Sequence, residues 1–283
     1  MKRLFIGGLG LFIICFLIGS IAWFGFEKQN EKLNTVNKVL NTNDIKNLDV
    51  LTENCKVLIK SGGQTSIKYK GKRNIDIKEV DNTLKVKETK ELENHYGLNF
   101  NPFRQFDDHL IITLPKEKLN KLKLSSSYNS INIKNLNIKS AEISKNNKNG
   151  GKVNIDKTKF EKLLYKGVNS QIKLDDSEVI NADIKTENAR ILSENSLIQK
   201  SVLLANHSNI YLSDIDVNSN FKASTKKGDI NISYKQAPNN ILLKLYPVHG
   251  TTNINNSRFV NDRVGNGDNI LELYTNDGDI NID

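Results

Sequence analysis

The chain ends with TNDGDINID (275–283), in which three aspartates alternate with asparagines. Carboxylate and amide oxygens are the ligands that calcium prefers, so this string is a candidate metal loop. A similar glycine-and-strand pattern occurs in NGGKVNID (149–156) and in KKGDINIS (226–233), where two lysines precede the glycine. A calcium loop would not keep two lysines at its ligand positions. We therefore predict corner glycines that each precede a short strand, and we expect neither a metal nor another cofactor.

A second set of carboxylates recurs about every 19 residues, which predicts an acidic column along a repeated fold. In this register Asp175 stacks on Glu194, and Asp176 stacks on Asn195 and then on Asp214. Calcium beside an arginine base is the chemistry with which pectate-lyase-like β-helices cleave acidic sugars, and Arg190 lies in the same region. A calcium-dependent polysaccharide lyase on a β-helix is thus the alternative function. A solvated column of corner residues is the plainer interpretation, and we favour it.

A third set of polar residues lies between the inward apolar residues of repeated strands and predicts a flat polar face. Its members are Asn132, Asn154, Lys173, Tyr211, Asn231 and Asn281. Such a face is a candidate binding surface for a polysaccharide or wall polymer, although a face that only confers solubility needs the same residue types. The sequence has no GxSxG, HExxH, CxxC or phosphate-loop motif, so we predict no catalytic residues and no enzyme.

These candidate residues recur because the chain itself repeats. From residue 121 onward, pairs of apolar residues separated by one polar residue return about every 19 to 22 residues, and a second set with the same period lies between them. One repeat of two short strands cannot bury its apolar face alone, whereas repeats stacked about 4.8 Å apart can. We therefore predict an all-β fold, a parallel β-solenoid or β-helix-like repeat domain. A conventional antiparallel sandwich is the alternative.

Strict alternation also predicts strands before the regular repeats begin. They lie at 48–50, 56–60, 66–70, 74–78, 83–87 and 109–115. Residues 89–108 lose the alternation and gain aromatic residues, so we expect an excursion that packs over one end or flank of the domain.

The N-terminus predicts a single membrane span. Residues 1–3 are basic and cytoplasmic, and residues 4–26 are uncharged and long enough to cross a bilayer as a helix. Residues 27–43 are polar with apolar residues at helical spacing, so we predict a juxtamembrane stalk or short helix. Residues 44–283 then form an extracellular β-repeat domain on the cell membrane. Small residues around position 22 leave a cleaved signal peptide open as the alternative.

The 283-residue chain has a net charge of +9. A basic exterior favours anionic lipid headgroups or anionic wall polymers as partners. The lysines alternate with acidic residues and asparagines, and no aromatic platform accompanies them, so we do not expect nucleic acid as a partner.

The strand ITLP (112–115), the GDI-x-I corners, the basic N-terminus and the single span together resemble the LiaG-like family of adhesin-type envelope proteins from Gram-positive bacteria. The resemblance covers about residues 45–283. It implies a membrane-anchored β-repeat protein that faces the cell wall, with a role in adhesion or envelope-stress regulation, and it transfers no catalytic residue. We therefore predict a non-enzymatic envelope protein, an adhesin or stress-response accessory, that binds an anionic wall polymer or a membrane partner. A passive scaffold for a membrane complex is a further alternative.

Overall fold

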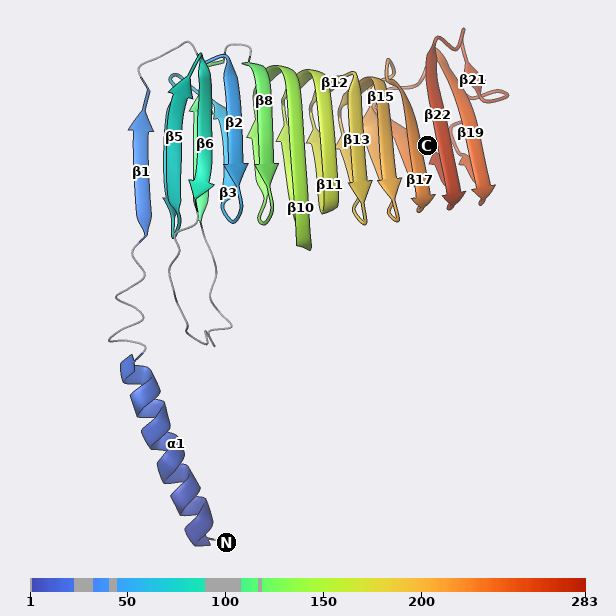
Figure 1. The fold of residues 1–283 in the computed structure, drawn as a ribbon. Coiled ribbons are helices and arrows are strands. Elements are labelled where there is room, and N and C mark those ends of the chain that lie inside the picture. Colours follow the sequence, from blue (N-terminus) through green and yellow to red (C-terminus); the bar gives the residue numbers. More distant parts are fainter. Residues whose placement is uncertain (1, 23–32, 41–44, 90–107, 117–118) are drawn as a thin grey trace.

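The computed structural model describes residues 2–22, 33–40, 45–89, 108–116 and 119–283. Helix α1 (Lys2–Ala22) is long and apolar enough to cross a bilayer. The rest of the described chain is a stack of β coils, drawn in Figure 1. The predicted excursion, apart from its end residues 89 and 108, lies outside the described residues, as does part of the predicted stalk.

Each coil of the stack contributes strands to two sheets. The first sheet, at the front of Figure 1, contains in spatial order β6 (Thr83–Thr89), β2 (Asn47–Thr52), β8 (Leu119–Ser126), β10 (Asn137–Asp156), β11 (Lys159–Asp175), β13 (Ala182–Glu187), β15 (Leu197–Asn206), β17 (Asn220–Lys227), β22 (Asn269–Asp277) and β19 (Ile241–His249). Short β12 (Glu178–Ile180) lies between β11 and β15.

The second sheet lies behind the first and contains, in the same order, β7 (His109–Leu114), β3 (Lys56–Ser61), β9 (Ile131–Lys134), the second halves of β10 and β11, β14 (Ile191–Glu194), β16 (Ile210–Ile215), β18 (Ile230–Tyr234), β23 (Ile280–Ile282) and β20 (Thr252–Ile254). All of these neighbours pair in parallel, which confirms the predicted β-solenoid.

The core lies between the two sheets and is made of aliphatic columns. One column of fully buried residues runs through Ile131, Val153, Ile172, Ile191, Ile210, Ile230 and Ile280. Burying one such side chain stabilises the fold by about 1.5–3 kcal/mol, so a long stack supports coils that could not fold singly.

The corners between the sheets explain the abundance of asparagine. One corner column has a left-handed backbone in five successive coils, with φ between 45° and 55° at Asn135, Lys157, Asp176, Asn195 and Asp214. Asparagine and aspartate tolerate this conformation better than other residues that have a Cβ. Buried hydroxyls support the corner from inside, because Ser177 Oγ accepts the N–H of Thr158 and Ser196 Oγ accepts the N–H of Ser177.

Both ends of the stack depart from the order of the sequence. At the N-terminal end, the coil of β6 and β7 lies outside the coil of β2 and β3, and three antiparallel strands follow it at the edges: β5 (Asn74–Val80), β4 (Ser66–Gly71) and β1 (Asn34–Val39). At the C-terminal end, β22 and β23 insert between the coils of β17/β18 and β19/β20. Ile282 therefore pairs with Ile232 on one side and with Ile254 on the other.

The helix predicted within residues 27–43 is wrong where the structure describes that segment. Residues 34–39 form β1, which pairs with β4 along its whole length. Val36 and Leu40 pack against the core from this position. Pairing with β4 satisfies the backbone of an exposed edge, which a separate helix would leave open, and this outweighs the weak helical spacing.

The C-terminal edge of the first sheet is protected. Strand β21 (Arg263–Val264) pairs antiparallel with the start of β19, and the N–H of Leu243 donates outward to Asp262 O. Alternate residues of a strand point their N–H groups the same way, so Pro247 occupies an outward position and offers no N–H there. A proline at such a position discourages another strand from adding to the edge.

Candidate functional site

The six residues of the predicted polar face lie in one row on the outer side of the second sheet. The register places Asn132 beside Asn154, Asn154 beside Lys173, Tyr211 beside Asn231, and Asn231 beside Asn281. Leu192 lies between Lys173 and Tyr211, and Asn253 extends the row past Asn281.

Asparagines of this row form hydrogen bonds with one another. Asn154 Nδ2 donates to Asn132 Oδ1 at 3.0 Å, and Asn281 Nδ2 donates to Asn231 Oδ1 at 2.9 Å. Asn253 Nδ2 continues the ladder to Asn281 Oδ1 at 2.8 Å. Such amide ladders stabilise stacked strands, so this row has a structural task whether or not it also binds a ligand.

The predicted acidic column is only partly assembled. Asp175 pairs with Glu194 in register, and Asp156 joins them on the other side of Asp175. Lys173 Nζ lies 2.8 Å from Glu194 Oε2 and 3.6 Å from Asp175 Oδ2. The hydrogen bond to Glu194 raises the pKa of Lys173, so this lysine remains a cationic partner of the carboxylates.

The other two acidic residues belong to the left-handed corner column. The backbone N–H of Asp176 donates to Glu194 O, and the N–H of Asp214 donates to Ser233 Oγ at 3.0 Å. Asp176 and Asp214 are therefore accounted for by corner geometry, which aspartate tolerates. In the part of the chain that the structure describes, no group of three or more His, Cys, Asp or Glu side chains could hold a metal ion.

The C-terminal aspartates have the corner role that the repeated pattern predicts. Asp279 Oδ1 accepts from the N–H and the hydroxyl of Thr251 at 2.7 and 3.0 Å. Asp279 also donates its own N–H to Asp229 Oδ1 of the neighbouring coil at 2.9 Å. The corners stack so closely that a Cβ on Gly278 would overlap the carbonyl oxygen of Gly228. The glycines are required by this close approach.

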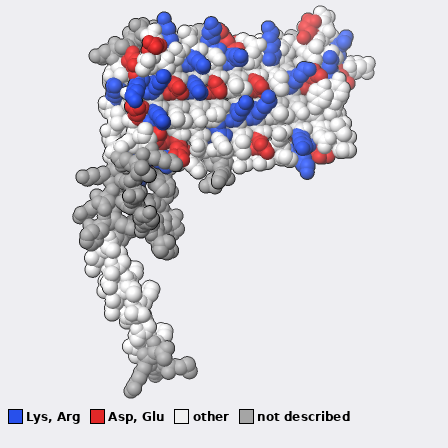
Figure 2. Space-filling view, in the orientation of Figure 1, with Lys and Arg blue, Asp and Glu red and all other residues white. Residues whose placement is uncertain are grey.

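The outer side of the first sheet carries a row of alternating charges, visible in Figure 2 as a line of blue and red. We call it the charge row, and in spatial order it contains Lys85, Asp49, Lys123, Glu142, Leu164, Asp183, Val202, Lys222, Glu272 and Lys244. Neighbouring opposite charges on adjacent strands attract one another and stabilise the register. The two ends of this row could not be predicted from the repeat, because their strands are stacked in an order that differs from their order in the sequence.

A shallow groove with a volume of ≈ 460 Å³ crosses the C-terminal part of this sheet. We call it the C-terminal groove. It is lined by Lys200, Ser201, Val202, Asn220, Phe221, Lys222, Lys244, Asp268, Ile270 and Glu272. Beside it the rings of Tyr246 and Tyr274 stack with centroids 4.6 Å apart and an interplanar angle of 12°. The groove thus combines apolar, aromatic and charged side chains on an open surface.

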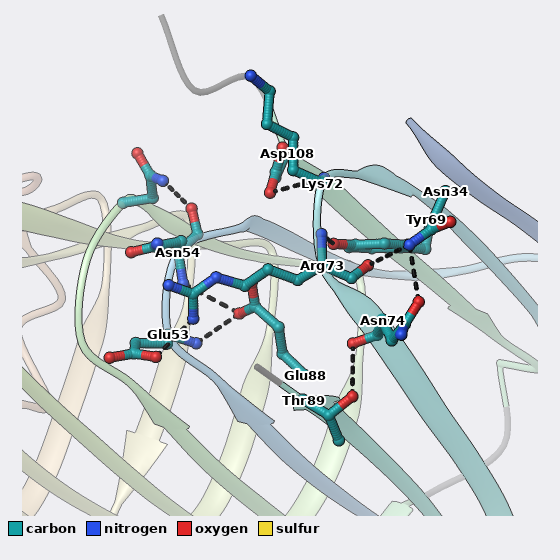
Figure 3. Close-up of polar contacts among 11 residues, drawn as sticks. Asn34, Glu53, Asn54, Tyr69, Lys72, Arg73, Asn74, Glu88, Thr89 and Asp108 are labelled. Atoms are coloured by element: carbon teal, nitrogen blue, oxygen red, sulfur yellow. Dashed lines mark hydrogen bonds and ion pairs between the residues drawn. The ribbon is translucent and has the colours of Figure 1, made fainter. Parts of the chain in front are cut away.

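A buried polar network lies at the N-terminal end of the stack and was also missed (Figure 3). The Glu88 side chain is fully buried, and its Oε2 accepts the N–H groups of Glu53 and Asn54 at 2.6 and 3.0 Å. Arg73 lies between two carboxylates in Figure 3, with Nη1 on Glu53 and Nε 3.7 Å from Glu88 Oε1. The sequence signal was Glu88 itself, which continues the inward alternation of Leu84 and Val86.

Burial dominates the electrostatics around this network. Desolvation raises the pKa of the Cys55 thiol and of the Asp108 carboxyl, and the nearby Glu88 charge adds to both shifts. Asp108 Oδ2 accepts the N–H of Lys72 at 3.2 Å, and the hydroxyl of Tyr69 accepts the N–H of Arg73 at 3.2 Å. The bond to Asp108 holds the β4–β5 turn against the start of β7, and the contacts of Arg73 with Glu53 and Glu88 hold it against the ends of β2 and β6, so the network closes the end of the core.

Lys145 is a buried cation at an inward position of β10. Its Nζ donates to the carbonyl of Tyr128 at 2.8 Å, and burial lowers its pKa to about 8. The side chain is almost inaccessible, so we assign it to packing of the adjacent corner.

A sequence model of the Toastrack DUF4097 family matches residues 45–283. A search of curated proteins finds no match. Among solved structures, a "putative adhesin" from Parabacteroides distasonis is 9% identical, with 89% of this chain and 98% of that chain covered and a TM-score of 0.47. A "putative adhesin" from Bacteroides fragilis is 17% identical, with 90% and 98% covered and a TM-score of 0.43.

Proposed function

Starting from the fact that the chain belongs to the Toastrack DUF4097 family, we propose that it is a non-enzymatic cell-envelope protein whose β-solenoid binds an anionic polymer of the cell wall. In this proposal α1 is retained as a single-pass anchor in the cell membrane and the solenoid lies outside the cell. The apolar length of α1 supports an anchor, and the resemblance to LiaG-like proteins supports the envelope location and a role in adhesion or stress response.

The observation that carries the proposal is the outer surface of the first sheet. Two adjacent outward rows expose Lys85, Lys87, Lys123, Lys166, Lys185, Lys222 and Lys244. The carboxylates in the same rows are Asp49, Glu142, Asp183 and Glu272. Basic side chains therefore exceed acidic ones on a long, flat surface, which attracts a polyanion over many weak contacts and loses that attraction in salt.

The chemistry of the described residues agrees with a binding role. Lys173 occupies the position where a cation would have to bridge Asp175 and Glu194, so the geometry gives the calcium-lyase alternative no support. A membrane-protein partner within an envelope-stress system is the alternative binding role, and the experiment below is designed to separate it from wall binding.

The test uses the full-length chain in detergent micelles, incubated with cell-wall sacculi over a series of salt concentrations. One batch of sacculi keeps its anionic polymers and a matched batch is stripped of them. We expect binding that requires the anionic polymer and falls as salt rises. Absence of binding to both batches would remove the wall as the ligand and would direct the search to a membrane-protein partner.

A further inference from the structure

The C-terminal groove is assembled by the out-of-order coils at that end of the stack. Strand β22 lies between β17 and β19, so Glu272 has Lys222 on one side and Lys244 on the other. Strand β15 completes the groove next to β17. Figure 2 shows basic and acidic side chains gathered over β17, β22 and β19 at this end of the face. The groove therefore depends on the tertiary arrangement and does not belong to a repeat unit.

The floor of the groove has apolar side chains between charged neighbours. Val202 and Ile270 point outward and are 45% and 38% exposed. In the charge row the neighbours of Val202 are Asp183 and Lys222. An exposed aliphatic side chain among charged neighbours lowers the solubility of the protein. Two such side chains within one groove therefore indicate a surface that a ligand can cover.

The lysines of the groove differ in whether a carboxylate lies at ion-pair distance. Lys222 Nζ lies 2.8 Å from Glu272 Oε2, and the hydroxyl of Tyr274 donates to Glu272 Oε1. Glu272 is thus held from two sides. Within the described residues, Lys244 and Lys200 have no carboxylate at ion-pair distance, and both are exposed. Two ammonium groups on either side of the apolar floor are available to an anionic ligand.

Tyr246 provides an aromatic wall at the end of the same surface. One side of its ring stacks on Tyr274. Strand β21 pairs with β19 only at Ile241 and Leu242, so it does not cover the other side of Tyr246, which is 45% exposed. An open ring face next to hydrogen-bonding side chains suits a ligand with an apolar face and a polar edge.

We propose that the C-terminal groove binds a segment of an anionic glycan, with one sugar ring against Tyr246, another sugar ring against the apolar floor, and anionic substituents against Lys244 and Lys200. Sugar hydroxyls donate to Asp268 and Glu272. This rests on the proposed function and deepens it, because it places the strongest contact with the wall polymer in one groove.

A sugar chain fits this surface better than a peptide or a lipid. The groove lies on the face of a sheet whose backbone groups are already paired, so it offers a peptide no strand to join. It is open and flanked by charges, which would leave much of a lipid acyl chain in water. A sugar ring has C–H groups for the floor and hydroxyls for the carboxylates.

The test measures binding of the full-length chain in micelles to anionic polymer released from sacculi, and to sacculi treated with protease. The variants are Lys244→Gln, Tyr246→Ala and both together. Lys60→Gln is the matched control, because this lysine is exposed on the outer side of the second sheet, away from the lysine-rich first sheet. Tyr246→Phe keeps the ring, and thermal unfolding checks that each variant is folded.

We expect Lys244→Gln to weaken binding about threefold and Tyr246→Ala about fivefold, which are the sizes of single exposed contacts. The double variant should lose about 15-fold if the contacts are independent. Tyr246→Phe and Lys60→Gln should stay within about twofold of the wild type.

Three results would overturn the proposal. Wild-type binding with Lys244→Gln and Tyr246→Ala unchanged would refute the groove while leaving wall binding intact. Loss of binding after protease treatment of the sacculi would identify a peptide ligand instead. Absence of wild-type binding to the released polymer and to sacculi would refute the groove and the proposed function together.

Discussion

Glu88 is the residue whose removal should damage the N-terminal end of the solenoid most. Its buried carboxylate accepts two backbone N–H groups, at 2.6 and 3.0 Å, and lies beside Arg73. Glu88→Ala removes both hydrogen bonds, and each hydrogen bond to a charged acceptor contributes about 1.5–3 kcal/mol. Relief of the desolvation of the carboxylate offsets part of this loss. We therefore expect the free energy of unfolding to fall by about 3 kcal/mol.

Thermal unfolding of the full-length chain in micelles measures this effect. For a domain of this size about 1 kcal/mol lowers Tm by about 2–4 °C, so the expected decrease is about 6–12 °C. Glu88→Gln should lie between the wild type and Glu88→Ala, because its amide oxygen still accepts a backbone N–H while its amide nitrogen faces Arg73. Glu142→Ala is the control, since this carboxylate is exposed on the charge row.

Hydrogen exchange gives a second, local measurement. In Glu88→Ala the amides of Glu53 and Asn54 should exchange faster than in the wild type, because they lose their acceptor. A Tm within about 2 °C of the wild type, with unchanged exchange at these amides, would show that the network does not hold this end of the core.

Three further predictions concern other parts of the solenoid. Lys157→Asn should raise the free energy of unfolding by about 1 kcal/mol, because lysine is strained at φ 48°. The urea midpoint should rise accordingly, and an unchanged midpoint would contradict this. Pro247→Val restores an outward N–H at the edge of β19 and should cause concentration-dependent self-association in analytical ultracentrifugation, whereas a monomer at every concentration would contradict edge protection. Asp108→Asn should be more stable than the wild type at about pH 7, because burial raises the pKa of Asp108 and penalises its ionised form. This advantage should shrink as the pH falls through the raised pKa, and an advantage that grows in acid would refute the assignment.

The sequence predicted the parts of the fold that are local and repeated. Alternation identified the inward aliphatic residues, and the repeat placed Ile172, Ile191 and Ile210 in one column, as the register confirms. Comparing similar stretches predicted the corner role of Gly228 and Gly278 correctly, whereas Gly151, predicted in the same way, lies within β10. Each of these features depends on residues within one or two neighbouring coils, so the repeat period of the sequence is sufficient to predict it.

The ends of the solenoid could not be predicted in this way. Insertion of β22 between β17 and β19 changes which residues are neighbours without changing the period, so Lys222, Glu272 and Lys244 gave no sequence signal. The strand β1 was mistaken for a helix because its apolar residues recur at helical spacing, while its partner β4 is 27 or more residues away. The Arg73–Glu88 pair also depends on long-range contact, although the inward register of Glu88 marked one member.

The central claim is that an anionic wall polymer binds the lysine-rich first sheet, with its strongest contact in the C-terminal groove. The most direct measurement is binding of the full-length chain to sacculi with and without their anionic polymer, across a salt series, for the wild type and for Lys244→Gln with Tyr246→Ala. We expect wild-type binding to require the polymer and to fall as salt rises, and we expect the double variant to bind about 15-fold more weakly. Equal binding to native and stripped sacculi, or none to either, would contradict it.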